Sequence, residues 1–279
     1  MANLPAPEFR ESVAAIEEMG YGTIWIGEAI GREAMAASAL ILSATSRVMV
    51  ATGIANIYAR DPTAMINGAR TLNEPWNNRF VLGIGVSHVP LVSARGHAYD
   101  RPVTTMRTYL DAMEKAPWRL KVGTEPPPVV LAALGPKMME LARDRSAGAH
   151  PYFVPVEHTR EARSILGGDR LLAPEAAVVF TTERSKAREA GNRYMQTYLV
   201  LDNYRRNLQR LGWSDQELEP PGSDRIFDAV VAWGSIDDIA AKLKRHLDAG
   251  ADHVAVQVLT TMPERAPLDD LRRLAPLVI

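Results

Sequence analysis

Cysteine is absent from the 279 residues of the sequence. This absence excludes disulfide bonds, metal sites built from thiolates and a cysteine nucleophile. Other reactive groups are sparse as well. Histidines and carboxylates do not cluster with the spacing of metal ligands, and no Gly-x-Ser-x-Gly motif marks a serine nucleophile. We therefore expect no metal site, and we expect any enzymatic chemistry to come from a bound organic cofactor.

An excess of charge of one sign and a long apolar run are also absent. The chain has 32 basic and 33 acidic residues and a formal net charge of −1, so no basic surface for nucleic acid or anionic membrane is indicated. No stretch reaches the roughly 18 uninterrupted apolar residues of a transmembrane helix. The opening residues MANLPAPEFRES lack the basic and apolar regions of a secretory signal. We expect a cytoplasmic protein with no nucleic-acid or membrane partner.

Helical and strand patterns alternate along the chain. A helical segment that ends at a glycine and leads into an apolar strand occurs in AIEEMG-YGTIWI, LARDRSAG-AHPYFV and KRHLDAG-ADHVAV. Gly20, Gly148 and Gly250 suit the left-handed position that closes a helix. Candidate strands cover residues 23–28, 48–55, 80–86, 129–134, 149–154, 175–181 and 253–259. Buried strands that alternate with helices indicate a parallel sheet.

The even spacing of these strands favours an α/β fold of the TIM (β/α)8 barrel type. Such a barrel has eight strands, whereas the sequence offers seven, and the missing one would precede the helix expected at 5–19. We therefore predict a parallel barrel that lacks its first strand and is open between the strands at 23–28 and 253–259. The two neighbouring edges would be unpaired, and a rearrangement that fills the gap, a partner chain or residues upstream of the given sequence could relieve this. We expect upstream residues to be missing and a homodimer to cover part of the edges.

Two segments are longer than a connection requires. Residues 87–128 contain a further helical pattern and end in a proline-rich stretch, and residues 203–234 contain two adjacent prolines and several aromatic residues. If the missing strand is counted as the first, these segments follow strands 4 and 7. Long loops at the carboxyl ends of barrel strands commonly carry function. We predict one domain, residues 1–279, with insertions at about 87–128 and 203–234.

The stretch VVLAALGPKMMELA (129–142) passes from a buried strand into a helix, with Gly135 and Pro136 at the turn. Proline suits the first turn of a helix because its φ is preset and its missing N–H would be unpaired there. A helix start presents free N–H groups and a partial positive charge, to which Lys137 adds a full charge. The turn is either an anion pocket or an ordinary strand–helix turn with a solvated lysine.

The stretch FVLGIGVSH (80–88) has two glycines of a dinucleotide-binding fingerprint, Gly83 and Gly85. The third glycine is absent, and His88-Val89-Pro90 is not expected to open a helix, so we reject that interpretation. Two glycines near the end of a strand more simply permit something flat to approach the backbone. Gly53 in VMVATGIAN is expected to mark a bulge or a similar close approach.

Taken in order, several motifs resemble the bacterial luciferase-like family, and most closely its actinobacterial branch of oxidoreductases that use the deazaflavin coenzyme F420. The motifs are GYGTIWIGE, TSRVMVATGIANIYARDPTAM, RFVLGIGVSH, VVLAALGPKMMELARDRSAGAHPYFV and PEAAVVFTTERSKAREAG. The family has a barrel fold. The resemblance implies an oxidoreductase that transfers a hydride between coenzyme F420 and a small organic substrate. An FMN-dependent luciferase-like monooxygenase and a non-catalytic cofactor-binding protein are the alternatives.

By position, the resemblance implies four cofactor-binding segments. The phosphate would lie at the turn formed by Ala133, Leu134, Gly135, Pro136, Lys137 and Met138. A bulge behind the central ring, where relatives often have a cis peptide bond, would be formed by Gly53 and Ile54 and continue into Ala55 and Asn56. Gly83, Gly85, Val86 and Ser87 would border the ring system, and His150 and Pro151 would line the phosphate side.

Glu28 and His88 are the candidate catalytic residues. In some sugar-phosphate dehydrogenases of the family, the segment similar to WIGEA carries an acid followed by a catalytic histidine. Here Glu28 fills the acid position but Ala29 follows it, which argues against that mechanism and substrate. Glu28 is expected either to hydrogen-bond the cofactor ring or a substrate hydroxyl, or to be a helix-capping or salt-bridged acid of the scaffold. His88 is the acid–base candidate, with Tyr58 and His97 behind it.

Overall fold

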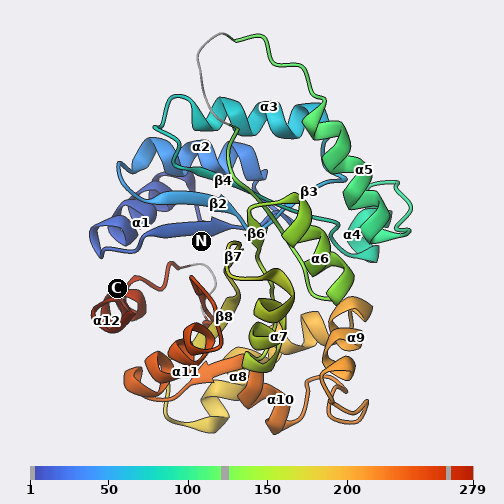
Figure 1. Ribbon diagram of the computed structural model, residues 1–279. Helices are drawn as coiled ribbons and strands as arrows, with labels where there is room; N and C mark the ends of the chain where they lie inside the picture. Colours follow the sequence, from blue (N-terminus) through green and yellow to red (C-terminus); the bar gives the residue numbers. More distant parts are fainter. Residues whose placement is uncertain (1–3, 121–125, 262–264, 279) are drawn as a thin grey trace.

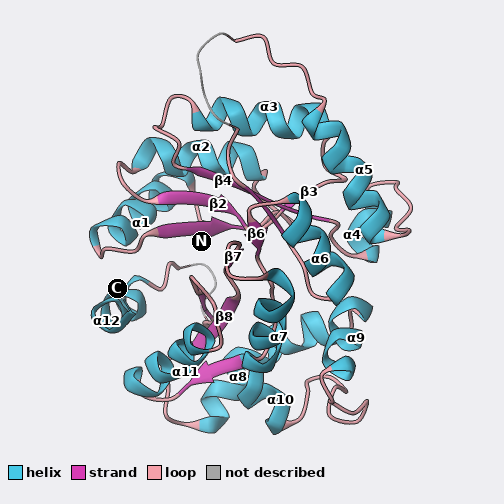
Figure 2. Ribbon diagram, viewed as in Figure 1, coloured by secondary structure: helices cyan, strands magenta, loops and turns pink. Residues whose placement is uncertain are grey.

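A computed structural model describes residues 4–120, 126–261 and 265–278. The chain forms a curled parallel sheet with helices on its outer side, so it is an α/β, TIM-barrel-like half-barrel (Figures 1 and 2). The described strands are β1 (Thr23–Ile26), β2 (Met49–Thr52), β3 (Ala55–Asn56), β4 (Phe80–Gly85), β5 (Val129–Leu131), β6 (Gly148–Ala149), β7 (Leu171–Leu172), β8 (Glu175–Val179), β9 (Val231–Trp233) and β10 (Ala255–Val258).

The strands pair in parallel in two groups. One sheet has the order β1-β2-β4-β5-β6-β7, with β3 beside β4, and the other has the order β10-β8-β9. Because β7 and β8 follow each other along residues 171–179, this stretch of chain joins the two sheets. Each parallel connection needs a crossover, and a helix supplies most of them.

The helices have bounds that reflect local sequence signals. They are α1 (Ala6–Glu18), α2 (Ala34–Ala44), α3 (Pro62–Asn73), α4 (Val89–Ala94), α5 (Pro102–Glu114), α6 (Pro136–Arg145), α7 (Val156–Leu166), α8 (Arg184–Leu199), α9 (Asp202–Arg210), α10 (Asp224–Val230), α11 (Ile236–Asp248) and α12 (Leu268–Val278). In α1, the buried residues Phe9, Val13 and Ile16 recur at the spacing of one helical face. In α11, Ser235 and Asp238 form a complete capping box.

The prediction of a barrel that lacks its first strand is confirmed. Within the described residues no strand precedes α1, β1 pairs with β2, β10 pairs with β8, and no backbone ladder joins β1 to β10. A side-chain hydrogen bond crosses the opening instead, because Trp25 Nε1 donates to His253 Nε2 at 3.0 Å. The first and last helices, α1 and α12, lie next to each other on this side of the molecule (Figure 1).

Two local predictions were wrong. His88 is the N-cap of α4, which begins at Val89, so His88-Val89-Pro90 does open a helix; a proline in the first turn has the φ that a helix requires. Gly148 lies within β6 and does not close a helix. A Cβ there would lie 2.1 Å from the carbonyl oxygen of Leu171, so a close approach of strands requires this glycine.

The predicted insertions have structure of their own. Residues 87–128 contain α4 and α5, and residues 203–234 contain most of α9, all of α10 and the strand β9, which was not predicted. The strand was missed because it is short and follows α10 without a loop. Among the described residues, no helix is both long enough and apolar enough to cross a membrane.

Candidate functional site

The predicted site residues follow the carboxyl ends of successive strands, which meet at one end of a parallel half-barrel. Glu28 follows β1; Gly53 and Ile54 follow β2; Ala55 and Asn56 form β3; Gly83 and Gly85 lie in β4, with Val86, Ser87 and His88 after it; Ala133, Leu134, Gly135, Pro136, Lys137 and Met138 follow β5; His150 and Pro151 follow β6. The fold therefore gathers these residues at one end of the sheet.

Glu28 is the centre of an ion-pair network. Its side chain is 5% exposed, and its carboxylate accepts hydrogen bonds from Arg60 (Nη1 to Oε2, 3.0 Å) and from the backbone N–H of Asn56 (2.8 Å) and of Ala34 (3.2 Å). A second nitrogen of Arg60 also contacts Glu28, and the same nitrogen reaches Glu33. These contacts tie the loop after β1 to β3 and to the start of α2.

Burial by itself would raise the pKa of Glu28, but the hydrogen bonds and charge of Arg60 and the backbone N–H of Asn56 outweigh it, so the pKa is lowered. Glu28 is therefore ionised at neutral pH, with both oxygens engaged. This geometry is that of the salt-bridged scaffold acid, one of the two roles expected from the sequence.

The Gly53–Ile54 peptide bond is cis. A Cβ on Gly53 would lie 2.9 Å from His150 Nε2 and 3.3 Å from Trp25 Cε3. The rings of Trp25 and His150 are stacked, with centroids 4.1 Å apart and planes 11° apart, and His150 Nδ1 is 2.6 Å from the carbonyl oxygen of Ala173. This aromatic stack, which includes a tryptophan that the sequence did not point to, therefore forms a rigid support beside Gly53.

Gly83 and Gly85 are tightly packed against protein atoms. A Cβ on Gly83 would lie 1.8 Å from the carbonyl oxygen of Thr52, and a Cβ on Gly85 would lie 2.7 Å from the Ile54 side chain. Close packing against Thr52 of β2 and against Ile54, which follows β2, accounts for both glycines, and the approach of a flat ligand stays a prediction. Val86 and Ser87 follow directly, and Ser87 has a φ of 58°, a strained value for a residue with a side chain.

The turn before α6 has an open and polar surface. Gly135 is the N-cap, Pro136 lies in the first turn, and no side chain caps the helix. A Cβ on Gly135 would meet no atom within 4 Å, and Lys137 is exposed. The carbonyl oxygen of Leu134 accepts a hydrogen bond from His158 Nε2 at 2.8 Å, which fixes the turn from behind. The turn thus combines free N–H groups, a lysine and space, as an anion site requires.

His88 lies at the other side of the site, against α9. Its ring is 5.4 Å from that of Tyr204, and its buried Nδ1 has no hydrogen-bond partner among the described residues. Burial lowers the pKa of His88, and a hydrogen bond with Asn203 only partly opposes this effect. The imidazole is therefore neutral at neutral pH. Tyr58 and His97 contact each other, with ring centroids 5.6 Å apart.

A buried acid surrounded by tyrosines adjoins this region and was not predicted. Glu175 is 4% exposed; its Oε2 accepts from Tyr194 Oη at 2.9 Å and from the backbone N–H of Phe153 at 3.2 Å. Its Oε1 has no partner among the described residues. Burial raises the pKa of Glu175 to about 7, although these two hydrogen bonds act to lower it. The one sequence signal was an acid at the start of the apolar run EAAVV.

Two tyrosine hydroxyls form a directed chain next to this acid. Tyr198 Oη donates to Tyr152 Oη at 3.1 Å, and Tyr152 Oη donates to Gln257 Oε1 at 2.6 Å. Leu134 and Leu259, which adjoin strand ends at the site, pack against the same apolar cluster. The tyrosines therefore lie close to the turn before α6.

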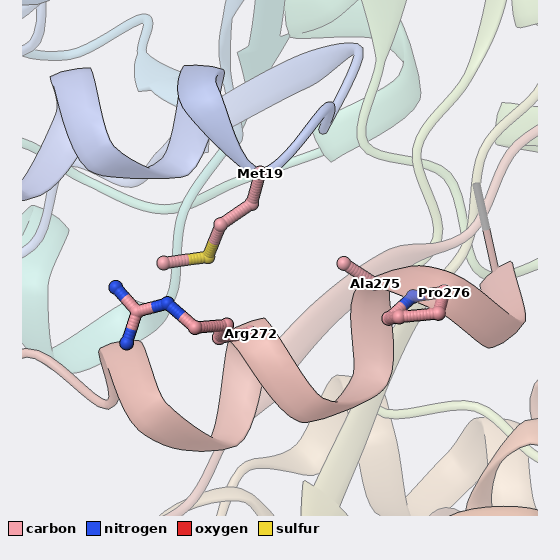
Figure 3. Close-up of a pocket in the computed structure, with 4 residues that line it drawn as sticks. All are labelled: Met19, Arg272, Ala275 and Pro276. Carbon is pink, nitrogen blue, oxygen red and sulfur yellow. The ribbon is translucent and has the colours of Figure 1, made fainter.

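A cavity of about 290 Å³ lies elsewhere, between the end of α1 and α12 (Figure 3). It is lined by Met19, Arg272, Ala275 and Pro276, and Met19 extends toward α12 from the opposite helix. Arg272 already has an ion-pair partner in Asp269, at 3.1 Å. This cavity lacks acid–base groups in its lining and shares no lining residue with the site.

A sequence model of the luciferase-like monooxygenase family matches residues 2–253. The chain belongs to this family. A Mycobacterium tuberculosis protein, provisionally named a coenzyme F420-dependent oxidoreductase, is 26% identical over 98% of this chain and 95% of its own length. A 5,10-methylenetetrahydromethanopterin reductase of Methanolobus tindarius is 23% identical over 85% of this chain and 86% of its own. The resemblance inferred from the sequence motifs is thereby confirmed.

Solved structures confirm the fold. The coenzyme F420-dependent tetrahydromethanopterin reductase of Methanopyrus kandleri superimposes with a TM-score of 0.75 at 16% identity, covering 99% of this chain and 96% of that chain. At this identity the likeness concerns the fold, and the site must be argued from the residues themselves.

Proposed function

We propose that this luciferase-like protein is an oxidoreductase that uses coenzyme F420 and transfers a hydride between the deazaflavin and a small organic substrate. The observation that carries the proposal is the turn before α6. Its helix N-terminus is uncapped by side chains, has open space at Gly135, and is supported from behind by the contact of His158 with Leu134. The Mycobacterium tuberculosis relative named for coenzyme F420 supports this cofactor over FMN.

The residues present fit such a cofactor. The free N–H groups at Gly135 and Lys137 and the Lys137 ammonium would hold a phosphate. Gly53 and Ile54, supported by the stack of Trp25 and His150, would lie behind the ring system. When bound, coenzyme F420 supplies a carbon that accepts or donates a hydride, so that the protein need not supply the redox group.

The side chains of this protein then orient the substrate and manage a proton. His88 is neutral and its Nδ1 is unpaired, so it can exchange a proton with a substrate oxygen without first losing another partner. The protons of the Tyr198 and Tyr152 hydroxyls are directed at Tyr152 and Gln257, so these hydroxyls would accept a hydrogen bond from the substrate rather than donate one. Glu28, ionised and fully hydrogen-bonded, holds the loop after β1 in place and is not the proton donor in this proposal.

Binding measurements separate the proposal from the FMN alternative. Purified protein is titrated with coenzyme F420 and, in parallel, with FMN, and fluorescence reports binding. Saturable binding of coenzyme F420 is expected. Tight binding of FMN without binding of coenzyme F420 would favour a monooxygenase and overturn the choice.

A second assay tests for catalysis. The protein with bound coenzyme F420 is offered aldehydes, ketones, alcohols and enones, and the deazaflavin absorbance reports hydride transfer. Turnover of one class is expected and would name the substrate. If the cofactor binds but no compound in the panel reacts, the non-catalytic alternative is preferred.

The proposal includes a cytoplasmic homodimer. The free edges of β1 and β10 carry backbone groups that no ladder pairs within the described chain, which favours coverage by a partner. Light scattering on the purified protein tests this part, since a monomer at working concentration would contradict it.

A further inference from the structure

We infer that a pocket beside Glu28 binds an anionic group of the substrate, either a carboxylate or a phosphate ester. We call this site the arginine pocket; residues Glu28, Ala29, Arg32, Glu33, Arg60 and Arg95 lie in its lining. The inference rests on the proposed function, because it names a substrate class for the same enzyme.

The arginine pocket lies next to the proposed cofactor site. Its volume is about 190 Å³, which is enough for several waters, each of which occupies about 30 Å³, or for one small anionic group. It is formed by the loop after β1, the residues after β3 and the end of α4. The hydrogen bond from the Asn56 N–H to Glu28 connects its wall directly to the segment that begins at Gly53 and Ile54.

The two acids in the lining are already partnered. Arg60 bonds to both Glu28 and Glu33, and its side chain is 11% exposed. Glu33 also caps α2, because it accepts a hydrogen bond from the N–H of Ala36 at 2.7 Å. Neither carboxylate therefore needs a further cation from the pocket.

The other two arginines lack an acidic partner among the residues that the structure describes. Arg32 donates to the carbonyl oxygen of Leu4 at 2.6 Å and lies 4.9 Å from the centroid of Phe9, and its Nε has no hydrogen-bond partner in the described chain. Arg95 caps the end of α4, is exposed, and makes no side-chain hydrogen bond or ion pair with any described residue. The lining of the arginine pocket thus contains three arginines and two acids, so its net charge is positive.

This arrangement selects for an anion. A guanidinium offers a planar fork of N–H donors that matches a carboxylate or a phosphate oxygen pair. A cationic ligand would be repelled by Arg32 and Arg95, and a neutral ligand would leave their charges uncompensated. Ala29 adds only a methyl group to the lining, so space for the ligand is retained.

Chemical modification tests the arginine pocket one residue at a time. Phenylglyoxal modifies exposed arginines, and peptide mass spectrometry gives the rate at each position in the presence of inorganic phosphate, acetate, or chloride at equal ionic strength. Phosphate or acetate should slow modification of Arg95 several-fold, while Arg107, an exposed arginine on α5, should react at an unchanged rate. Protection by one anion alone identifies the preferred class.

Other results would overturn the inference. If Arg95 is modified at the same rate in all three salts, no anion is bound there. If phosphate or acetate slows modification of Arg95 and Arg107 equally, the effect is a general effect of salt. In a second experiment, Arg95→Glu should weaken binding of the protecting anion at least about tenfold, as loss of one charged hydrogen-bond partner implies, whereas Arg107→Glu should not. Unchanged affinity in folded Arg95→Glu would also reject the pocket.

Protection of Arg95 and binding of coenzyme F420 are measured independently, so the two proposals can fail separately. If Arg95 is protected but coenzyme F420 does not bind, the proposed cofactor fails and the anion pocket stands. If coenzyme F420 binds but Arg95 is not protected, the cofactor assignment stands and the substrate class inferred here is rejected.

Discussion

Two buried glutamates respond to burial in opposite ways. Glu28 and Glu175 are both largely removed from water, and removal from water favours the neutral acid in each case. Arg60 reaches Glu28 and lowers the pKa of its carboxyl below the usual value. No arginine or lysine pairs with Glu175 in the described chain, so burial wins and raises its pKa to about 7. The Arg60 guanidinium, together with the backbone N–H groups of Asn56 and Ala34, therefore keeps Glu28 charged.

The raised pKa of Glu175 predicts how stability depends on pH. The folded protein holds the Glu175 proton up to about pH 7, whereas an unfolded glutamate releases it near its ordinary value of 4.5. The folded state therefore binds more protons in this window, and the free energy of unfolding falls as pH rises, by about 3 kcal/mol in total. Glu175→Gln removes this loss, so the stability difference between wild type and variant should change by that amount between pH 4.5 and 7.

Urea unfolding at several pH values measures this difference. Burial lowers the pKa of three histidines to about 4, namely His150, His158 and His246. These histidines affect the free energy of unfolding with the opposite sign, since they make the protein less stable as pH falls below about 6.5. Their contribution is common to both proteins and cancels in the comparison. A difference that is flat with pH would show that Glu175 has an ordinary pKa.

Lys137 should contribute to cofactor affinity without contributing to folding. Lys137→Glu replaces a positive charge at an open helix N-terminus by a negative one, and a change of at least about 1.4 kcal/mol, or tenfold in the dissociation constant of coenzyme F420, is expected. The residue is exposed, so the unfolding midpoint should stay unchanged. Lys115→Glu, another exposed lysine, serves as the control. Equal affinities in both variants would place the cofactor phosphate elsewhere.

At the scale of elements, α7 positions the turn that precedes α6. The neutral imidazole of His158, which is 1% exposed, donates from Nε2 to the carbonyl oxygen of Leu134 at 2.8 Å. A buried carbonyl without its donor costs about 1–3 kcal/mol. The contact thus fixes the carbonyl immediately before the N-cap Gly135, and with it the direction of the free N–H groups.

Two substitutions at His158 distinguish positioning from simple packing. His158→Leu fills much of the space but cannot donate, so it should destabilise the fold by about 1–3 kcal/mol and weaken binding of coenzyme F420. His158→Gln keeps an N–H donor and should restore most of the affinity. Calorimetry and fluorescence titration give the two quantities. Equal affinity in the Leu and Gln variants would show that the hydrogen bond does not set the geometry of the turn.

Elements with strong local signals were predictable from sequence, and contacts between distant segments were not. The start of α6 at Pro136 and the parallel strands follow from glycine, proline and apolar patterns that act within a few residues. The stack of Trp25 on His150 and the cage around Glu175 join residues far apart in the sequence, so no local pattern reveals them. The close packing at Gly85 was not predicted because Ile54, whose side chain lies at its Cβ position, is far away in the sequence, between β2 and β3.

At the scale of the whole molecule, the half-barrel is held together along one side by backbone ladders and across the opening by side chains. The chain from Leu171 to Val179 connects the two sheets, since its β7 pairs with β6 and its β8 pairs with both β9 and β10. Across the opening, Tyr21 Oη donates to the carbonyl oxygen of Leu271 at 2.8 Å, and Trp25 donates to His253. These two contacts link the first third of the chain to its end, where the strand edges themselves do not pair.

The hydrogen bond across the opening can be tested by removing one donor. Trp25→Phe retains an aromatic ring against His150 but loses the Nε1–H that reaches His253 Nε2 at 3.0 Å. Trp118→Phe is a matched control, because the buried Nε1 of Trp118 has no hydrogen-bond partner among the described residues. Both changes trade an indole for a phenyl ring. Urea unfolding should therefore show Trp25→Phe to be less stable than Trp118→Phe by about 1 kcal/mol, the net value of one hydrogen bond. If the two variants lose equal stability, the contact between Trp25 and His253 does not hold the opening together, and closure depends on α1 and α12 instead.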